Sequence, residues 1–283
     1  MSSRKEVDAV IKKFFVAVII SLLVISSQIA VAEDYDWNQA PRFGNKADIA
    51  RYIERERRQG QKVFPIVLTN FKFSVDKEIA EKERDRLQEE FVNRFAIAPK
   101  SYIKFIVMGT GQLVYEITDE YPGTCVANAY RNGNISNLTD EERNLYYEAV
   151  KIVKEAKKRP SEIEKARYIH DEICKMAPFP KNNPSNKTAI GALIIGETNC
   201  LGYTDAFYML GRMAGLKVGR IGGTINTGTT GHAWNWITFS NGKSYCIDVT
   251  LDNTYNSHDW FLKTKSQMEK THWCYWEIIP NLQ

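Results

Sequence analysis

The sequence has few of the residues that mark fibrous, disordered or strongly charged proteins. Its 283 residues include only 17 glycines and 9 prolines, and 43% of the side chains are hydrophobic. This composition excludes a collagen-like repeat and an intrinsically disordered chain. The formal net charge of +4 is too small to predict a nucleic-acid-binding surface. The length predicts one or two globular domains with a sizeable core.

The first 32 residues have the layout of a secretory signal peptide. Four basic residues within the first 13 positions precede an apolar run from Phe14 to Ile25, and Ala30-Val31-Ala32 follows at the expected cleavage point. An uncleaved membrane anchor is the alternative, but the run is shorter than the roughly 20 apolar residues that span a bilayer. We therefore expect a secreted or cell-envelope protein, which contacts a membrane only if this segment is retained.

Residues 33–135 are predicted to form an N-terminal α+β region. Residues 45–59 and 76–95 have the charged, sparsely apolar pattern of surface helices, and residues 62–69 are typical of a β-branched strand. Two further strands, 102–108 and 112–118, flank a Gly-Thr-Gly turn. The result is a βαββ unit, which we interpret as a structural lead-in, with a substrate-presenting module as the alternative.

Two helices are predicted after the Asn- and Gly-rich stretch near residue 135. Residues 139–142 (TDEE) and 161–164 (SEIE) have the pattern of a capping box and begin helices over residues 139–157 and 161–175. His170 lies beside the apolar stripe of the second helix, where a hydrogen-bonded core histidine is more common than a catalytic one. That stripe consists of Ile163, Ala166, Ile169 and Ile173.

Cys200 lies where a thiol gains reactivity. A polar loop precedes it, and a helical pattern that ends at Gly215 begins at it. The first turn of a helix presents free N–H groups and the positive end of the helix dipole, and both favour a thiolate. A buried structural cysteine is the more common role of an isolated Cys, so Cys200 alone does not predict catalysis.

His232 and Asp248 flank a predicted β-hairpin. Two alternating strands, residues 233–239 and 243–250, surround a Ser-Asn-Gly sequence. A two-residue loop would place the two side chains on opposite faces of the ribbon, whereas a three-residue loop places them on one face, one diagonal apart. Gly242 suits the left-handed third residue of the longer loop. We therefore predict the three-residue turn and a His–Asp pair.

A cysteine, a histidine and an aspartate in this arrangement predict covalent acyl transfer. Cys200 would attack an acyl carbon, His232 would share and later donate the proton, and Asp248 would orient and stabilise the imidazolium. The resulting thioester would be released to water or to an amine. The backbone N–H of Cys200 is a candidate oxyanion donor. These steps need no cofactor, and no clustered carboxylate loop predicts calcium.

These motifs resemble those of the bacterial members of the transglutaminase-like superfamily. The resemblance covers about residues 139–255 and implies that Cys200, His232 and Asp248 form a papain-like triad. It also implies an α+β catalytic domain over residues 136–283, in which the helix that bears the Cys packs against an antiparallel sheet that carries the His and Asp. The matching residues are Cys200, Gly202-Tyr203, Ala206-Phe207, His232-Ala233-Trp234-Asn235, Tyr245 and Asp248-Val249-Thr250.

The sequence departs from this family pattern at two positions beside the triad. Leu251 stands where many relatives have Trp, and Asn199 stands where many have a small apolar residue. Both departures leave the triad intact but affect the expected substrate pocket. The candidate substrate-binding residues are Trp234, Trp236 and Tyr203, with packing in the core as the alternative for each tryptophan.

The remaining cysteines and histidines receive no catalytic role. Neither CxxC nor HxxxH spacing occurs, so we predict no metal site. In an exported protein, four further thiols allow up to two disulfides, and a Cys246–Cys274 bridge is one arrangement. His258 and His272 lie outside the motifs. The four thiols belong to Cys125, Cys174, Cys246 and Cys274.

We expect an exported thiol acyl-transfer enzyme that acts on peptide, glutamine or cell-wall-peptide amides and does not bind nucleic acid. Hydrolysis, as in cysteine proteases, is favoured over transamidation, because transamidation needs a second site for the amine. A non-catalytic cell-surface binding module with the same fold is the alternative. Its distinguishing feature would be loss of a triad residue, and none is lost here.

Overall fold

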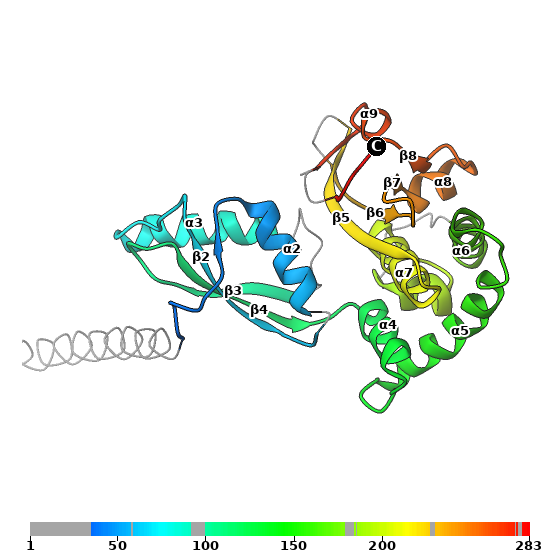
Figure 1. Ribbon diagram of the computed structural model, residues 1–283, viewed down its shortest axis with the longest axis horizontal. Helices are drawn as coiled ribbons and strands as arrows, with labels where there is room; N and C mark the ends of the chain where they lie inside the picture. Colours follow the sequence, from blue (N-terminus) through cyan, green and yellow to red (C-terminus); the bar gives the residue numbers. More distant parts are fainter. Residues whose placement is uncertain are drawn as a thin grey trace, which may run out of the picture. The chain divides into compact units, whose positions relative to one another are not determined.

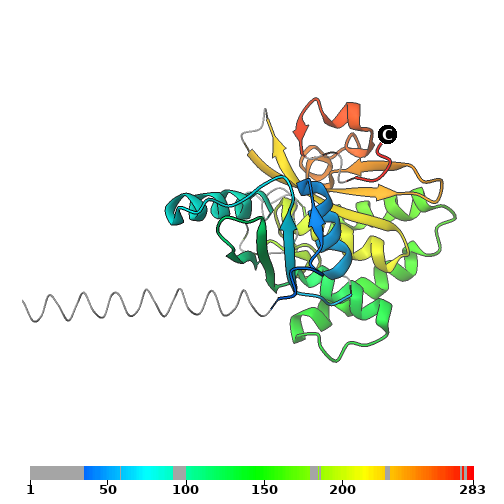
Figure 2. The same ribbon diagram turned by 60° about the vertical axis from the view of Figure 1, so that its left-hand side comes forward.

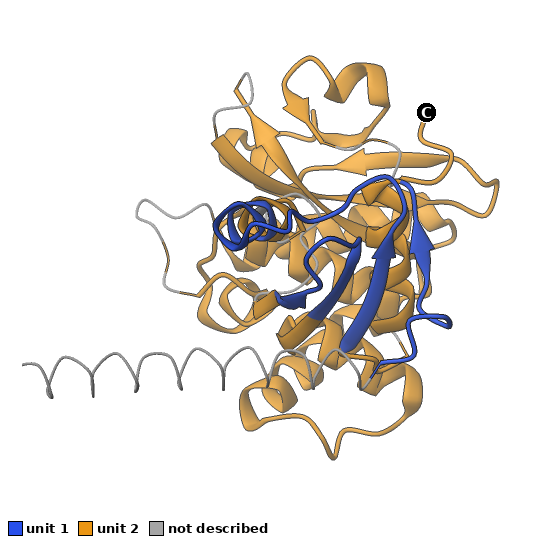
Figure 3. Cartoon of the chain, turned by 90° about the vertical axis from the view of Figure 1, so that its left-hand side faces the viewer, with its two compact units in different colours: residues 1–44, 63–84, 103–115 blue, residues 45–62, 85–102, 116–283 orange. Residues whose placement is uncertain are grey.

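The computed structural model describes residues 35–57, 59–91, 100–178, 184, 186–226, 230–274, 276 and 279–283. The predicted signal segment, residues 1–32, lies outside this part of the chain. Within it, no helix has both the length and the apolar character needed to cross a membrane. Figure 3 shows two compact units, the first with residues up to 44, 63–84 and 103–115, the second with residues 45–62, 85–102 and 116–283. The domain boundary at residue 135 stays a prediction.

The strands predicted in the N-terminal region belong to a four-stranded sheet with the order β1-β2-β4-β3. The predicted succession of strand, helix, strand and strand is confirmed, and β1 adds a short parallel strand beside β2. Residues 92–95 of the predicted long helix lie outside the described residues. The elements are β1 (Arg42–Phe43), α2 (Lys46–Arg57), β2 (Val63–Leu68), α3 (Lys77–Glu89), β3 (Lys100–Ile106) and β4 (Gln112–Asp119).

The second unit includes α2 and continues with α4 (Pro122–Asn132), α5 (Asp140–Ala156) and α6 (Glu162–Met176). A short π-helix, η2 (Gly191–Ile195), precedes α7 (Cys200–Met213). The capping box of α5 is confirmed, because the Thr139 hydroxyl and the Glu142 carboxylate each accept from the other residue's N–H. At α6 only half of the predicted box forms. The Ser161 hydroxyl accepts from the Glu164 N–H, but the Glu164 carboxylate accepts from that hydroxyl instead of the backbone.

One residue of the predicted stripe of α6 is not buried. Ile163, in the first turn, is 49% exposed, whereas the other three predicted residues of the stripe are fully buried. The buried face of α6 therefore begins one turn later than predicted. His170 is buried at 1% exposure, in agreement with its predicted place beside the stripe.

α7 is the central helix of the second unit. It contacts α4, α5 and α6 as well as β5 (Lys217–Ile225) and β6 (Thr230–Thr238) (Figure 1). Eleven of its 14 residues are buried, so the helix is enclosed on nearly all sides and not only along one stripe. Helices and sheet together form an α+β fold, as predicted, with the Cys-bearing helix packed against the sheet.

The sheet that α7 contacts has five strands in the order β8-β7-β6-β5-β9 (Figure 2). All four strand pairs are antiparallel. The remaining elements are β7 (Ser244–Ile247), α8 (Val249–Tyr255), β8 (Phe261–Lys263), α9 (Lys265–Met268) and β9 (His272–Trp273).

The predicted three-residue turn between β6 and β7 is confirmed. Thr238 pairs with Ser244 and Asn235 with Ile247, which is the predicted register. Gly242 has φ of 81°, the left-handed conformation expected for the third loop residue. The predicted second strand is too long, because the chain leaves the sheet after Ile247 and Asp248 begins helix α8.

A buried ion pair joins α7 to β5 and α4. The Asp205 carboxylate accepts from the backbone N–H of Gly123 at 3.1 Å and of Ala189 at 2.9 Å, and it forms an ion pair with Arg220. The Arg220 guanidinium also donates to Thr124 at 3.0 Å. Each charge in this group thus has an opposite charge beside it, which offsets part of the cost of burial, although Arg220 Nε is buried without a hydrogen-bond acceptor among the described residues.

We predict that Asp205→Ala lowers the free energy of unfolding by about 3–5 kcal/mol, because it leaves the Arg220 guanidinium buried without its counter-charge. Urea unfolding followed by circular dichroism measures the change. Asp259→Ala, which removes an exposed carboxylate, is the control and should change the value by less than about 0.5 kcal/mol. A loss of under about 1 kcal/mol in the Asp205 variant would contradict the prediction.

Candidate active site

Cys200 is the first residue of α7. Asn199, one of the two departures from the family pattern, is the N-cap of this helix, and its side chain accepts from the Leu201 N–H at 3.1 Å. Gly202 allows the first turn to pack closely, since a Cβ there would lie 1.8 Å from the Thr198 hydroxyl and 2.7 Å from the Thr188 carbonyl oxygen. The sequence around Cys200 thus holds the thiol at the positive end of a helix.

His232 and Asp248 lie together, as the predicted register requires. His232 Nε2 is 2.6 Å from Asp248 Oδ2, and both side chains are buried. The His232 side chain also interacts with Cys200, which contributes to its raised pKa. Because Nε2 is used by the carboxylate, Nδ1 is the ring nitrogen left for the thiol. The structure therefore brings the three residues of the predicted triad together.

The pKa values of the pair are displaced in opposite directions. Burial opposes the charge on His232, but the Asp248 carboxylate and Cys200 outweigh it and raise the pKa of His232 to about 10. Burial would also raise the pKa of Asp248, but His232 and His272 hold it well below its ordinary value. An imidazolium beside a carboxylate is thus the stable state at neutral pH.

His272 is a residue of this site to which the sequence analysis gave no role. Its Nε2 is 3.1 Å from the same Asp248 oxygen that contacts His232, and its Nδ1 is 2.9 Å from the Thr271 hydroxyl. The residue comes from β9, which pairs with the far side of β5. No local pattern connects it to Asp248, so only the fold could reveal this contact.

The three predicted substrate-binding residues lie in the core. The Tyr203 ring is fully buried, and its hydroxyl donates to the Ala177 carbonyl at 2.8 Å. Trp234 is 1% exposed and stacks on His232 with ring centroids 5.9 Å apart. Trp236 packs on Gly219 of the neighbouring strand. These contacts favour the packing alternative for the tryptophans, and a substrate-binding role for all three stays a prediction.

Three other cysteines lie in surroundings that disfavour the thiolate. Burial raises the pKa of the Cys174 and Cys246 thiols to about 12. Burial and the nearby Glu142 carboxylate raise the pKa of Cys125 still further. Within the described residues no disulfide joins any two cysteines, so the Cys246–Cys274 bridge considered above does not form.

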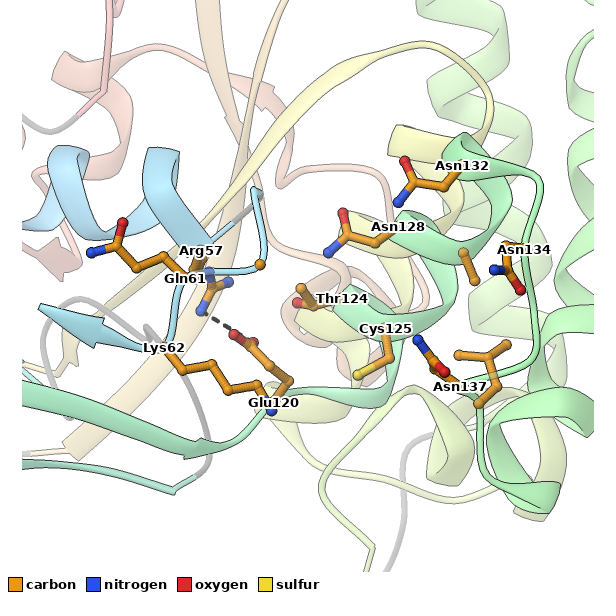
Figure 4. Close-up of a pocket in the computed structure, with 13 residues that line it drawn as sticks. Arg57, Gln61, Lys62, Glu120, Thr124, Cys125, Asn128, Asn132, Asn134 and Asn137 are labelled. Carbon is orange, nitrogen blue, oxygen red and sulfur yellow. Dashed lines mark ion pairs between the residues drawn. The ribbon is translucent and has the colours of Figure 1, made fainter.

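A polar pocket of about 440 Å³ lies beside α4 in the second unit, and the Cys125 side chain contributes to its wall (Figure 4). Arg57 and Glu120 form an ion pair of 3.7 Å at one side. The pocket lining does not include any residue of the predicted triad. Five amide side chains line it, those of Gln61, Asn128, Asn132, Asn134 and Asn137.

Residues 149–261 match the family model of the transglutaminase-like superfamily, and this range contains Cys200, His232 and Asp248. The chain contains a transglutaminase-like domain. The resemblance inferred from the motifs is therefore confirmed at the level of the superfamily. A solved structure described as "Crystal structure of a TGase" is similar over 75% of this chain and 59% of its own length, with 16% identity and a TM-score of 0.35. No match was found among curated proteins.

We predict that Asp248→Asn lowers the pKa of His232 from about 10 towards its ordinary value of about 6.5, because burial remains while the main counter-charge is lost. Asn keeps an oxygen for the Leu251 N–H that Asp248 caps in the transglutaminase-like domain. Imidazole ¹⁵N resonances of labelled chain, followed against pH, measure the change. A His232 that titrates near its ordinary value in the unsubstituted chain would contradict the prediction.

The raised pKa of His232 also determines how the free energy of unfolding changes with pH. A folded-state pKa above the ordinary value means that protonation of His232 favours folding, so this contribution is complete below pH about 6.5 and is lost as the pH rises through about 10. Urea unfolding between pH 6 and 10 should show a steeper alkaline loss in the unsubstituted chain than in Asp248→Asn.

Proposed function

We propose that the chain is an exported thiol acyl-transfer enzyme in which Cys200, His232 and Asp248 form the catalytic triad. The observation that carries the proposal is the hydrogen bond between the buried Asp248 carboxylate and His232, whose pKa is also raised by Cys200 at the start of α7. The transglutaminase-like domain supports it, since the matched range includes all three residues. The substrate class is a peptide or glutamine amide, with cell-wall peptides included.

In the first step the Cys200 thiolate attacks the amide carbon. A C–S bond forms, and the carbonyl electron pair moves to oxygen, where N–H groups at the start of α7 would stabilise the oxyanion. When the carbonyl re-forms, the C–N bond breaks and the leaving amine takes a proton from His232. The products are a thioester and a free amine, and His232 is then neutral.

In the second step neutral His232 takes a proton from the incoming nucleophile, which attacks the thioester. The C–S bond breaks, Cys200 leaves as a thiolate, and His232 is again an imidazolium beside Asp248. Water gives a carboxylic acid and an amine gives a new amide. We propose hydrolysis as the main reaction, because water needs no second binding site.

An activated thiol should react with an electrophile faster than an ordinary one. We predict that iodoacetamide labels Cys200 at pH 7 about 10 to 30 times faster in the unsubstituted chain than in His232→Ala, because an ordinary cysteine is only a few per cent thiolate at this pH. Mass spectrometry of peptides identifies the labelled residue. Equal, slow labelling of both chains would overturn the proposed activation.

A peptide-library assay, run with and without an added primary amine, tests the reaction itself. We expect hydrolysis products without the amine and none from Cys200→Ala in either condition. Product formation only when the amine is present would replace hydrolysis with transamidation. If labelling of Cys200 is fast but neither product forms, the binding-module alternative would take the place of the enzyme.

A further inference from the structure

A second cluster of histidine and carboxylate side chains lies in the second unit, apart from the triad. α6 contributes His170 and Asp171, α8 contributes Asp252, and the loop after α8 contributes His258. We call these four residues the α6–α8 cluster. His170 and Asp252 are buried, whereas His258 and Asp171 have about half of their side chains exposed, at 48% and 46%. The cluster is thus buried on its inner side and open to solvent on its outer side.

The arrangement around His170 places negative charge at both ring nitrogens. Nδ1 is 2.9 Å from Asp171 Oδ1, and Nε2 is 3.1 Å from Asp252 Oδ2. A neutral imidazole has one N–H and one lone pair, so one nitrogen would direct its lone pair at a carboxylate oxygen. The geometry therefore favours a positive charge between Nδ1 and Asp171, whether carried by a proton or by a metal cation.

Three donor atoms converge at that place. Asp171 Oδ1 is 2.9 Å from His170 Nδ1 and 2.7 Å from His258 Nε2, and all three atoms lie within 4.8 Å of one another. Tetrahedral zinc with bonds of about 2.0–2.1 Å to nitrogen and oxygen holds its ligand atoms about 3.3 Å apart. A small opening of the cluster would admit the ion, and the exposed side leaves room for a water as fourth ligand.

Asp252 supplies the support that a histidine ligand requires. Its Oδ2 accepts from His170 Nε2, which directs the Nδ1 lone pair towards the converging atoms. Its Oδ1 accepts from the Ser257 hydroxyl at 3.1 Å and from the Trp260 N–H at 2.8 Å. These two bonds fix the loop that carries His258. One buried carboxylate therefore orients one of the converging histidines and holds the loop that presents the other.

We propose that His170 Nδ1, Asp171 Oδ1 and His258 Nε2 bind a divalent transition-metal cation of the zinc type. Two imidazole nitrogens and one carboxylate oxygen are a donor set that suits zinc rather than calcium or magnesium. No local sequence motif marks this site, because the ligands come from α6 and from a loop more than 80 residues later.

The bound cation would stabilise the part of the fold that carries Asp248. It would join α6 to the loop after α8, and the Trp260 carbonyl of that loop accepts from the Asp248 N–H at 3.1 Å. His232, Asp248 and His272 also have donor atoms close together, but all three are buried and already hydrogen-bonded to one another. The α6–α8 cluster is therefore the site that an ion can reach from solvent.

Calorimetric titration with ZnCl₂ tests the proposal on the full chain carrying Cys200→Ala, so that the thiol at the proposed active site is not a competing ligand. After chelator treatment, we expect one equivalent of zinc to bind and the melting temperature to rise. His258→Ala should weaken binding at least tenfold, and Asp171→Asn should do the same. Asp259→Asn removes an exposed carboxylate next to His258 and should leave binding unchanged.

Three results would overturn the proposal. The first is no zinc binding in the Cys200→Ala chain. The second is stoichiometric binding that persists in His258→Ala but is lost in His272→Ala, which would place the ion in the buried triad region. The third is equal weakening by Asp259→Asn and Asp171→Asn, which would indicate a diffuse charge effect. Because no readout depends on catalysis, the outcome is separate from that of the proposed function.

Discussion

The buried carboxylate of Asp248 is the interaction on which the second unit depends most. It is fully buried and accepts from His232, from His272 and from the Leu251 N–H. An isolated carboxylate in the same place would cost several kcal/mol of desolvation, so these bonds are a condition of its burial. They also join β6, β9 and the first turn of α8, and the proposed active-site geometry is therefore built from the same contacts that hold these three elements together.

All four histidines of this protein contact an aspartate carboxylate. His232 and His272 contact Asp248, while His170 and His258 contact Asp171. α8 connects the two groups, because Asp248 caps this helix and Asp252, four residues later, accepts from His170. The two groups of histidine and carboxylate side chains thus share one short helix.

Structural features that depend on local sequence patterns could be predicted from the sequence, whereas features that depend on tertiary contacts could not. The turn ending at Gly242 follows from loop length and residue type, so its register was predictable. The contact between His272 and Asp248 was not predictable, because it depends on the pairing of β9 with β5, which no local sequence pattern indicates. Residues 249–250 looked like strand, but the Asp248 cap makes them helix. α4 could have been found, since Pro122 at its start and Gly133 at its end are standard helix-boundary residues.

The three-residue turn between β6 and β7 has a consequence for how this protein can change over evolution. Side chains alternate between the two faces of a strand, so an indel in the turn that shifted the register of β7 by one residue would exchange the two faces of that strand. Asp248 would then point away from His232. An indel is therefore tolerated here only where the loop absorbs it and the pairing of Thr238 with Ser244 is kept.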